Sequence, residues 1–195
     1  MILFSLVVST FGIIFIAELP DKTALAALIL ATKYRARDVI VGAWLAFLVQ
    51  TFVGVAAGSV LSLLPTEPIR IASGVGFLVF SILAFRRKED EIEKEEEASV
   101  AGAKPNRPGW LVSFLVIFAA EWGDLTQLAT AALVARNGHP LSIGLGAVLA
   151  LWTVTLVAAF SGSQLGKFLQ PKVLNRIGGV LFAAIGLYII WSAIF

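Results

Sequence analysis

Apolar positions dominate the chain in six long runs, which are separated by short polar or charged breaks. The runs cover approximately residues 2–32, 39–64, 69–85, 111–135, 143–166 and 174–195. As α-helices, runs of this length can cross a bilayer core that is about 30 Å thick. The mean hydropathy of +0.91, with 58% hydrophobic and 14% charged residues, lies outside the range of ordinary soluble domains. The pattern predicts an all-α integral membrane protein with six transmembrane helices.

The second half of the chain repeats the first. Residues 15–30 match residues 118–133 at eight of sixteen positions when they are aligned at an offset of 103. Further pairs recur outside this stretch, at Gly42 and Gly146, at Gly74 and Gly179, and at Phe77 and Phe182. Three helices per repeat is an odd number, which gives the two halves opposite orientations in the membrane, as in many secondary transporters. We therefore expect two inverted three-helix repeats, over 1–85 and 111–195, joined by a charged linker over 86–110.

Lysine and arginine residues predict the orientation in the membrane. Twelve lie in the loops at 33–38, 86–110 and 167–176, whereas only Arg70 and Arg136 lie on the opposite side. Cytoplasmic loops of membrane proteins carry such an excess of positive charge. We predict a multi-pass protein of the cell inner (plasma) membrane, with these three loops in the cytoplasm and both termini outside.

Four acidic residues lie deep inside apolar runs, in two copies of one motif. The first copy places Glu18 and Asp21 in F-I-A-E-L-P-D-K-T, and the second places Glu121 and Asp124 in F-A-A-E-W-G-D-L-T. A carboxylate in hydrocarbon costs several kcal/mol unless it is neutralised, paired or ligated, so such residues mark functional sites. Two matched sets predict one ion-handling site that arose by duplication.

Other polar groups accompany the four acids. Thr23, Thr126 and Gln127 add oxygen atoms close to the carboxylates, and Lys22 adds one positive charge, as a charge partner or a packing residue. Four polar residues are either supporting groups or ordinary interhelical hydrogen-bond partners: Gln50 and Thr51 in the second run, and Thr153 and Thr155 in the fifth.

Both motifs also contain a residue that disturbs a helix, Pro20 in the first copy and Gly123 in the second. A proline or a glycine at this depth predicts that each motif-bearing helix is kinked or broken near the membrane midplane. A break is tolerated there only where it lines a cavity or is buried in protein, and its freed carbonyls can then act as ligands.

The charge of the motifs limits the cargo. Four ionised carboxylates with one lysine leave a formal charge of −3, which must be balanced by cations, by protons or by both. Protons and a divalent ion should therefore compete for the same oxygens, which is the minimal mechanism of a cation/proton antiporter. An all-oxygen site suits Ca²⁺, Mn²⁺ or Mg²⁺. The chain has no cysteine and one histidine, His139 in a loop, so little favours Zn²⁺ or Cu⁺.

The doubled E-x-G-D-[KR]-[TS] pattern resembles that of the Gdt family of Ca²⁺/Mn²⁺:H⁺ antiporters, and the resemblance covers essentially the whole chain. It implies that Glu18, Asp21, Glu121 and Asp124 bind the transported cation, that access alternates between the two sides, and that manganese export is the physiological task. The chain departs from the pattern at Pro20, where the family has glycine, and at Leu125, where it has a basic residue. Leu125, in place of a basic residue, makes the site one charge more negative than the family pattern.

Two other functions remain open from the residues alone. An exporter of small organic cations such as basic amino acids would need an open cavity with carboxylates spread apart. A non-transporting membrane scaffold would tolerate neutralisation of all four acids. An enzyme is not expected, because no nucleophile–base pair is apparent. We expect divalent cations, protons and the lipid bilayer as partners, no prosthetic group and no nucleic acid; the sequence does not determine an oligomeric state.

Overall fold

The computed structural model describes residues 2–18, 30–31, 33–63, 65–86, 107–168 and 171–194. These described residues form seven helices and no strand. The helices are α1 (Phe4–Glu18), α3 (Ala36–Leu61), α4 (Thr66–Arg86), α6 (Gly109–Ala120), α7 (Leu125–Asn137), α8 (Pro140–Phe168) and α9 (Pro171–Ile194). The prediction of an all-α fold is confirmed.

Helices cover five of the six apolar runs with end points that differ from the expected ones by a few residues, and in the first run, 2–32, helix α1 is described over Phe4–Glu18. Two of them, at Ala36–Leu61 and Pro140–Ala158, are long and apolar enough to cross a membrane. A third span results if α6 and α7, which are bent by 69°, count as one broken helix. Shorter apolar helices lie at Phe4–Glu18, Ile71–Arg86 and Gly179–Ala193. The described residues thus make two or three candidate spans of a membrane protein.

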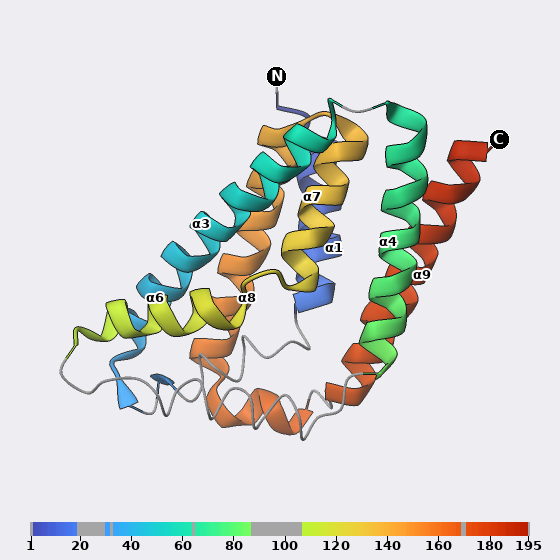
Figure 1. Ribbon diagram of the computed structural model, residues 1–195. Helices are drawn as coiled ribbons and strands as arrows, with labels where there is room; N and C mark the ends of the chain where they lie inside the picture. Colours follow the sequence, from blue (N-terminus) through green and yellow to red (C-terminus); the bar gives the residue numbers. More distant parts are fainter. Residues whose placement is uncertain are drawn as a thin grey trace.

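The helices of the first half pack mainly against helices of the second half. Helix α1 lies against α8, α3 against α6, α7 and α8, and α4 against α9, which runs beside it (Figure 1). Of the larger helix contacts in the described part of the chain, only that between α7 and α8 joins two helices of one half. The two halves therefore interlock and share one buried core, which includes Ile14, Phe47, Ile117 and Ile143.

Matched glycines make matched contacts in the two halves. A Cβ atom on Gly42 of α3 would lie 2.7 Å from the backbone N of Phe114 in α6. A Cβ atom on Gly146 of α8 would lie 2.6 Å from Val7 O and 3.2 Å from the backbone N of Phe11 in α1. Since both glycines touch the backbone of the neighbouring helix, each lets its helix pair approach closely, as small residues do in membrane proteins.

The aromatic residues follow the same repetition. Phe11 and Phe15 stack with ring centroids 5.5 Å apart, and so do Phe114 and Phe118, which lie 103 residues later. The recurring Phe77 and Phe182 contact each other, at 5.9 Å, where α4 meets α9. Equivalent residues thus have equivalent surroundings over much of the bundle.

Two tryptophans join α3 to α8 in a reciprocal contact. The rings of Trp44 and Trp152 stack with centroids 4.6 Å apart. Trp44 Nε1 donates to Trp152 O at 3.3 Å, and Trp152 Nε1 donates to Trp44 O at 3.1 Å. The two hydrogen bonds satisfy both indole N–H groups inside the bundle, where an unsatisfied donor would be costly.

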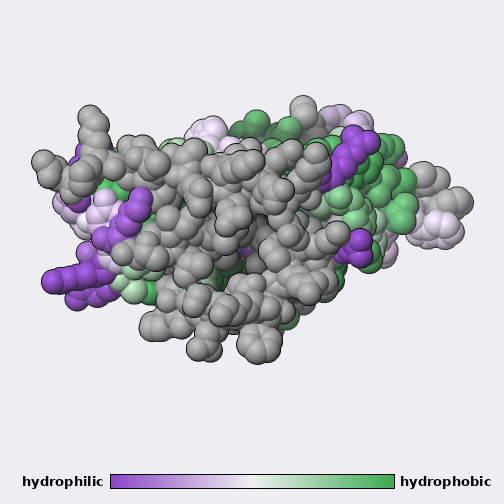
Figure 2. All heavy atoms as spheres, turned by 90° about the horizontal axis from the view of Figure 1, so that it is seen from below, coloured by the Kyte–Doolittle hydropathy of each residue, from purple (hydrophilic) through white to green (hydrophobic). Residues whose placement is uncertain are grey.

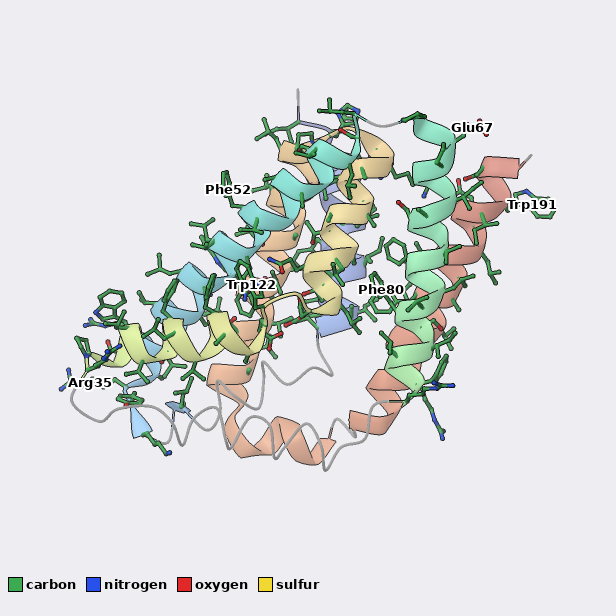
Figure 3. The ribbon with its side chains drawn as sticks, in the orientation of Figure 1. Arg35, Phe52, Glu67, Phe80, Trp122 and Trp191 are labelled. Carbon is green, nitrogen blue, oxygen red and sulfur yellow. The ribbon has the colours of Figure 1, made fainter. Side chains whose placement is uncertain are left out.

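Charged residues lie at both ends of the bundle. The start of α3, with Arg35, lies at the lower side of the view, as does the end of α4 with Arg86 (Figures 1 and 3). Both chain ends and the start of α4, with Glu67, lie at the upper side. Seen from below, hydrophilic side chains lie toward opposite edges of the molecule, next to hydrophobic surface (Figure 2). Phe52, which is 72% exposed, points away from the bundle, as expected of a lipid-facing residue.

Candidate cation-binding site

The second motif lies at a break between two helices. Helix α6 ends at Ala120 and α7 begins at Leu125, with a bend of 69° between them. Gly123 has a φ angle of +73°, a conformation that side chains rarely adopt, so a glycine is required at this turn. The break predicted from Gly123 is confirmed.

Three carboxylates come together at this break. One oxygen atom from each of Glu18, Glu121 and Asp124 lies within 4.8 Å of the others. Glu18 and Glu121 are buried, with 0% and 1% of their surface exposed, and Asp124 is half-buried. Two oxygens bound to one cation are separated by at most twice the metal–oxygen distance, which is about 5 Å for Ca²⁺ and about 4 Å for Mg²⁺. The bound of 4.8 Å meets the limit for Ca²⁺ and exceeds the limit for Mg²⁺, so the three oxygens are close enough to bind one ion of the size of Ca²⁺.

Glu18 and Glu121 come from different halves of the chain. Glu18 is the last residue of α1, and Glu121 follows the last residue of α6, where its backbone N–H still donates to Ile117 O at 3.0 Å. The carboxyl end of a helix carries a partial negative charge from its last carbonyl groups. A cation beside Glu121 is therefore attracted by the end of α6 in addition to the carboxylates.

Asp124 begins the next helix. Its Oδ1 accepts a hydrogen bond from the backbone N–H of Gln127 at 2.7 Å, and its Oδ2 accepts one from Thr126 Oγ1, also at 2.7 Å. Asp124 is thus the N-cap of α7 as well as a member of the carboxylate cluster. Thr126, predicted to support the site, contacts it through Asp124 and is itself buried.

Two glutamines connect the break to α3. The amide of Gln50, a buried residue, donates from Nε2 to Phe118 O in the last turn of α6 at 3.0 Å. Gln127 donates from Nε2 to Gln50 O at 3.0 Å, and its Oε1 accepts from the backbone N–H of Gly123 at 2.8 Å. Position 50 of α3 is therefore hydrogen-bonded to both sides of the break.

Thr51 lies beside Gln50, and its hydroxyl differs from that of its counterpart in the second half. Thr51 is 5% exposed, and its Oγ1 has no hydrogen-bond partner among the described residues. Thr155, 104 positions later, donates from Oγ1 to Leu151 O at 2.8 Å. The hydroxyl of Thr51 is thus available at the level of the break.

Trp122 occupies the exposed side of the break. It is 56% exposed, it lies where α6 meets α7, and its ring centroid is 5.0 Å from that of Phe118 (Figure 3). This location agrees with a residue that lines the approach to Glu121 and contributes no ligand atom.

Several predicted site residues of the first copy lie outside the described residues. These are Asp21, Lys22 and Thr23, together with Pro20 and the predicted break of the first helix. Within the described residues, sequence reasoning found the three clustered acids, Thr126 and Gln127. It left the role of Gln50 open between a supporting group and an ordinary hydrogen-bond partner; its polarity in an apolar run was the only signal.

An apolar helical chain that gathers carboxylates at the break of a helix has the features of an ion-handling membrane protein. The chain belongs to the GDT1 family of divalent cation/proton antiporters, whose model matches residues 6–92 and 109–195. This confirms the resemblance that the doubled motif indicated and assigns the chain to a family of transporters, not of enzymes.

Curated relatives agree with this assignment. A GDT1-like protein of Synechocystis is 34% identical over 196 residues, which cover 93% of this chain and 95% of that protein. Protein PAM71, chloroplastic, of Arabidopsis thaliana is 33% identical over 198 residues, which cover 89% of this chain. The match spans only about half of that longer relative, 53%. No solved structure matches the chain.

Proposed function

We propose that the chain is a secondary active transporter that exchanges a divalent metal cation for protons, with Mn²⁺ as the preferred ion and Ca²⁺ as the next. The approach of Glu18, Glu121 and Asp124 to within 4.8 Å, through one oxygen each, carries the proposal. Family membership supports the coupling of a divalent cation to protons. The three described carboxylates offer oxygen atoms only, which suits hard cations such as these.

Transport requires that the same carboxylates release the cation and accept protons. Two buried glutamates beside a half-buried aspartate repel one another when all are ionised, and this repulsion is relieved by a divalent ion or by protonation. We propose that Asp21 of the first copy completes the ligand set, with Thr23, Thr126, Gln127 and Lys22 as supporting residues. The physiological direction in this proposal is manganese export.

The proposed architecture has six transmembrane helices in two inverted repeats, over 1–85 and 111–195, with a cytoplasmic linker over 86–110. The matched contacts of Gly42 and Gly146 support it, because a duplicated chain that packs about a twofold axis makes each contact twice. In such an arrangement, the two halves exchange conformations and expose the site to one side and then the other.

The proposed location is the plasma membrane, with the basic loops in the cytoplasm and both termini outside. Both chain ends lie at the end of the bundle opposite the start of α3 with Arg35, which supports termini on the side opposite the basic loops (Figures 1 and 3). A C-terminal tag on intact cells tests the orientation. Access to the tag from outside is expected, and access only after permeabilisation would reverse the topology.

The decisive experiment uses the purified protein in liposomes that contain a pH-sensitive dye. Addition of Mn²⁺, Ca²⁺ or Mg²⁺ outside should drive proton release from the lumen, with Mn²⁺ effective at the lowest concentration. Glu121→Gln should abolish the signal, and the exposed Glu67→Gln should leave it unchanged. If folded wild-type protein responds to basic amino acids and to no metal, the protein is an exporter of organic cations. If it responds to neither, the protein is a non-transporting membrane scaffold.

A further inference from the structure

The break between α6 and α7 is bridged by two side-chain amides from different helices. We define the amide brace as Gln50 and Gln127 with their three hydrogen bonds, to Phe118 O, to Gln50 O and from the Gly123 N–H. Two of these bonds satisfy backbone groups that the break takes out of the regular helix pattern, one on each side of the bend. The third bond, from Gln127 Nε2 to Gln50 O, links α7 to α3.

The brace ties both ends of the segment that carries the carboxylates of the second motif. Glu121 and Asp124 lie between Phe118 and Gln127, so both carboxylates belong to the segment whose two ends are tied to position 50. Gln127 also donates its backbone N–H to Asp124 Oδ1, which connects the brace directly to a ligand residue. Groups that orient metal ligands in this way typically change affinity by about 10- to 100-fold when they are removed.

The positions equivalent to the two brace residues carry no amide in the sequence. At the offset of 104 that relates Gly42 to Gly146, Gln50 corresponds to Val154; at the motif offset of 103, Gln127 corresponds to Ala24. Neither valine nor alanine has an amide. The brace is therefore a property of one motif and not of the duplicated unit.

We infer that Gln50 and Gln127 are positioning residues that hold Glu121 and Asp124 at the spacing of one divalent ion, and that they thereby set which ion the site prefers. Selectivity among divalent ions depends on the size and the rigidity of the ligand cage, and a braced segment cannot relax around an ion of another radius. This inference rests on the proposed function.

The test replaces each amide by an unbranched apolar side chain of similar length, in Gln50→Met and Gln127→Met. In the liposome assay, each variant should raise the apparent KM for Mn²⁺ by about tenfold and lower the maximal rate much less. The preference for Mn²⁺ over Ca²⁺ should shrink as well. Thr155→Val is the matched control, because it removes one buried hydrogen bond at the equivalent level of the second half without touching the break.

The outcomes separate a positioning role from a merely structural one. An unchanged KM and an unchanged order of ions in both folded variants, or the same KM change in Thr155→Val, would overturn the inference. If the Met variants do not fold, Gln127→Asn decides, because it keeps the amide and the charge but is one methylene shorter than the span of the brace; a raised KM for Mn²⁺ supports the inference and an unchanged KM overturns it.

Failure of the proposed function is recognised separately, because the wild-type protein then exchanges no metal for protons. In that case, the shift of the melting temperature by Mn²⁺ and Ca²⁺ in detergent replaces the transport rate. A weaker shift for the Met variants than for Thr155→Val would support the brace, and equal shifts would refute it.

Discussion

The two halves of this protein agree in how their helices pack and differ in how their motifs are held. Gly42 and Gly146 occupy equivalent positions and touch equivalent backbone atoms of the neighbouring helix. By contrast, the two residues of the amide brace, Gln50 and Gln127, correspond in the sequence repeat to Val154 and Ala24, which have no amide. The contacts of the two glycines have kept the repetition of the sequence, whereas the two amide positions of the brace have not.

This difference indicates which parts of the molecule require both copies. Close helix contacts serve both halves equally, because a bundle that packs about a twofold axis repeats every interface. The proposed site takes ligands for one ion from both halves, so its cage is needed only once. Asymmetry can therefore accumulate around the ligands without loss of the fold.

The largest effect is expected from the glutamates, which test whether the halves are equivalent at the ligands. Glu18→Gln and Glu121→Gln should each lower the rate of exchange by about 100-fold or more, because removal of a ligand should cost at least as much as removal of a group that orients one. Equal losses in liposomes would make the two copies functionally equivalent. A wild-type rate in Glu18→Gln would show that α1 contributes no ligand to the site. Glu67→Gln is the control, because it removes an exposed carboxylate.

The next effect is the response to pH, which reports on the shared oxygens of both halves. Metal ligands must be deprotonated, so the affinity for Mn²⁺ should fall as the pH falls, by at most about tenfold per pH unit for each proton displaced. Metal binding to the purified protein between pH 5 and 8 measures this slope. A constant affinity over the whole range would show that protons and metal do not use the same groups.

The matched glycines allow a direct test of the symmetric packing. Gly42→Ala and Gly146→Ala place a methyl group against a helix backbone, and each should destabilise the fold by about 1–3 kcal/mol. Gly12→Ala and Gly76→Ala, where a Cβ meets nothing within 4 Å, are the controls and should be neutral or slightly stabilising. Thermal unfolding in detergent compares them. A large loss in one half only would contradict the matched packing.

Asp124 combines a capping role with a charge, and two substitutions separate them. Asparagine is also a good N-cap, whereas Asp124→Ala should lower the stability by about 1 kcal/mol. Both Asp124→Asn and Asp124→Ala should lose exchange, but only the alanine variant should also melt at a lower temperature. Retained exchange in Asp124→Asn would show that Asp124 acts only as the N-cap of α7 and not as a ligand.

The smallest effect is expected at the tryptophan pair between α3 and α8. Trp44→Phe and Trp152→Phe keep the ring contact and remove one hydrogen bond each, worth about 0.5–1.5 kcal/mol. Because the pair is reciprocal, the two variants should lower the melting temperature equally, and the exposed Trp110→Phe should not. Unequal losses would show that one of the two bonds dominates the contact.

The sequence predicted the features that follow from composition and local geometry. The apolar runs after the first located their helices to within a few residues, and Gly123 located the break because glycine readily adopts its φ angle. The repeat also predicted that Glu18 would lie near Glu121, although 103 residues separate them.

The sequence did not predict which partners the polar groups choose. The bond from Gln50 to Phe118 O depends on the angle at which α3 crosses α6, and no local pattern encodes that angle. The pairing of Trp44 with Trp152 was missed for a related reason. Trp44 and Trp152 lie 108 residues apart in the chain, and no local pattern relates them.

The interlocking of the two halves has a consequence for the biosynthesis of the protein. A ribosome delivers α1, α3 and α4 to the membrane first, yet their larger contacts among the described helices are all with α6, α7, α8 and α9. Until the second half is translated, Glu18 and Gln50 therefore lie in the lipid without the protein surfaces that later bury them. A chain that stops after α4 should be a preferred substrate for membrane proteases, so the cell can recognise an incomplete copy before it becomes an ion leak.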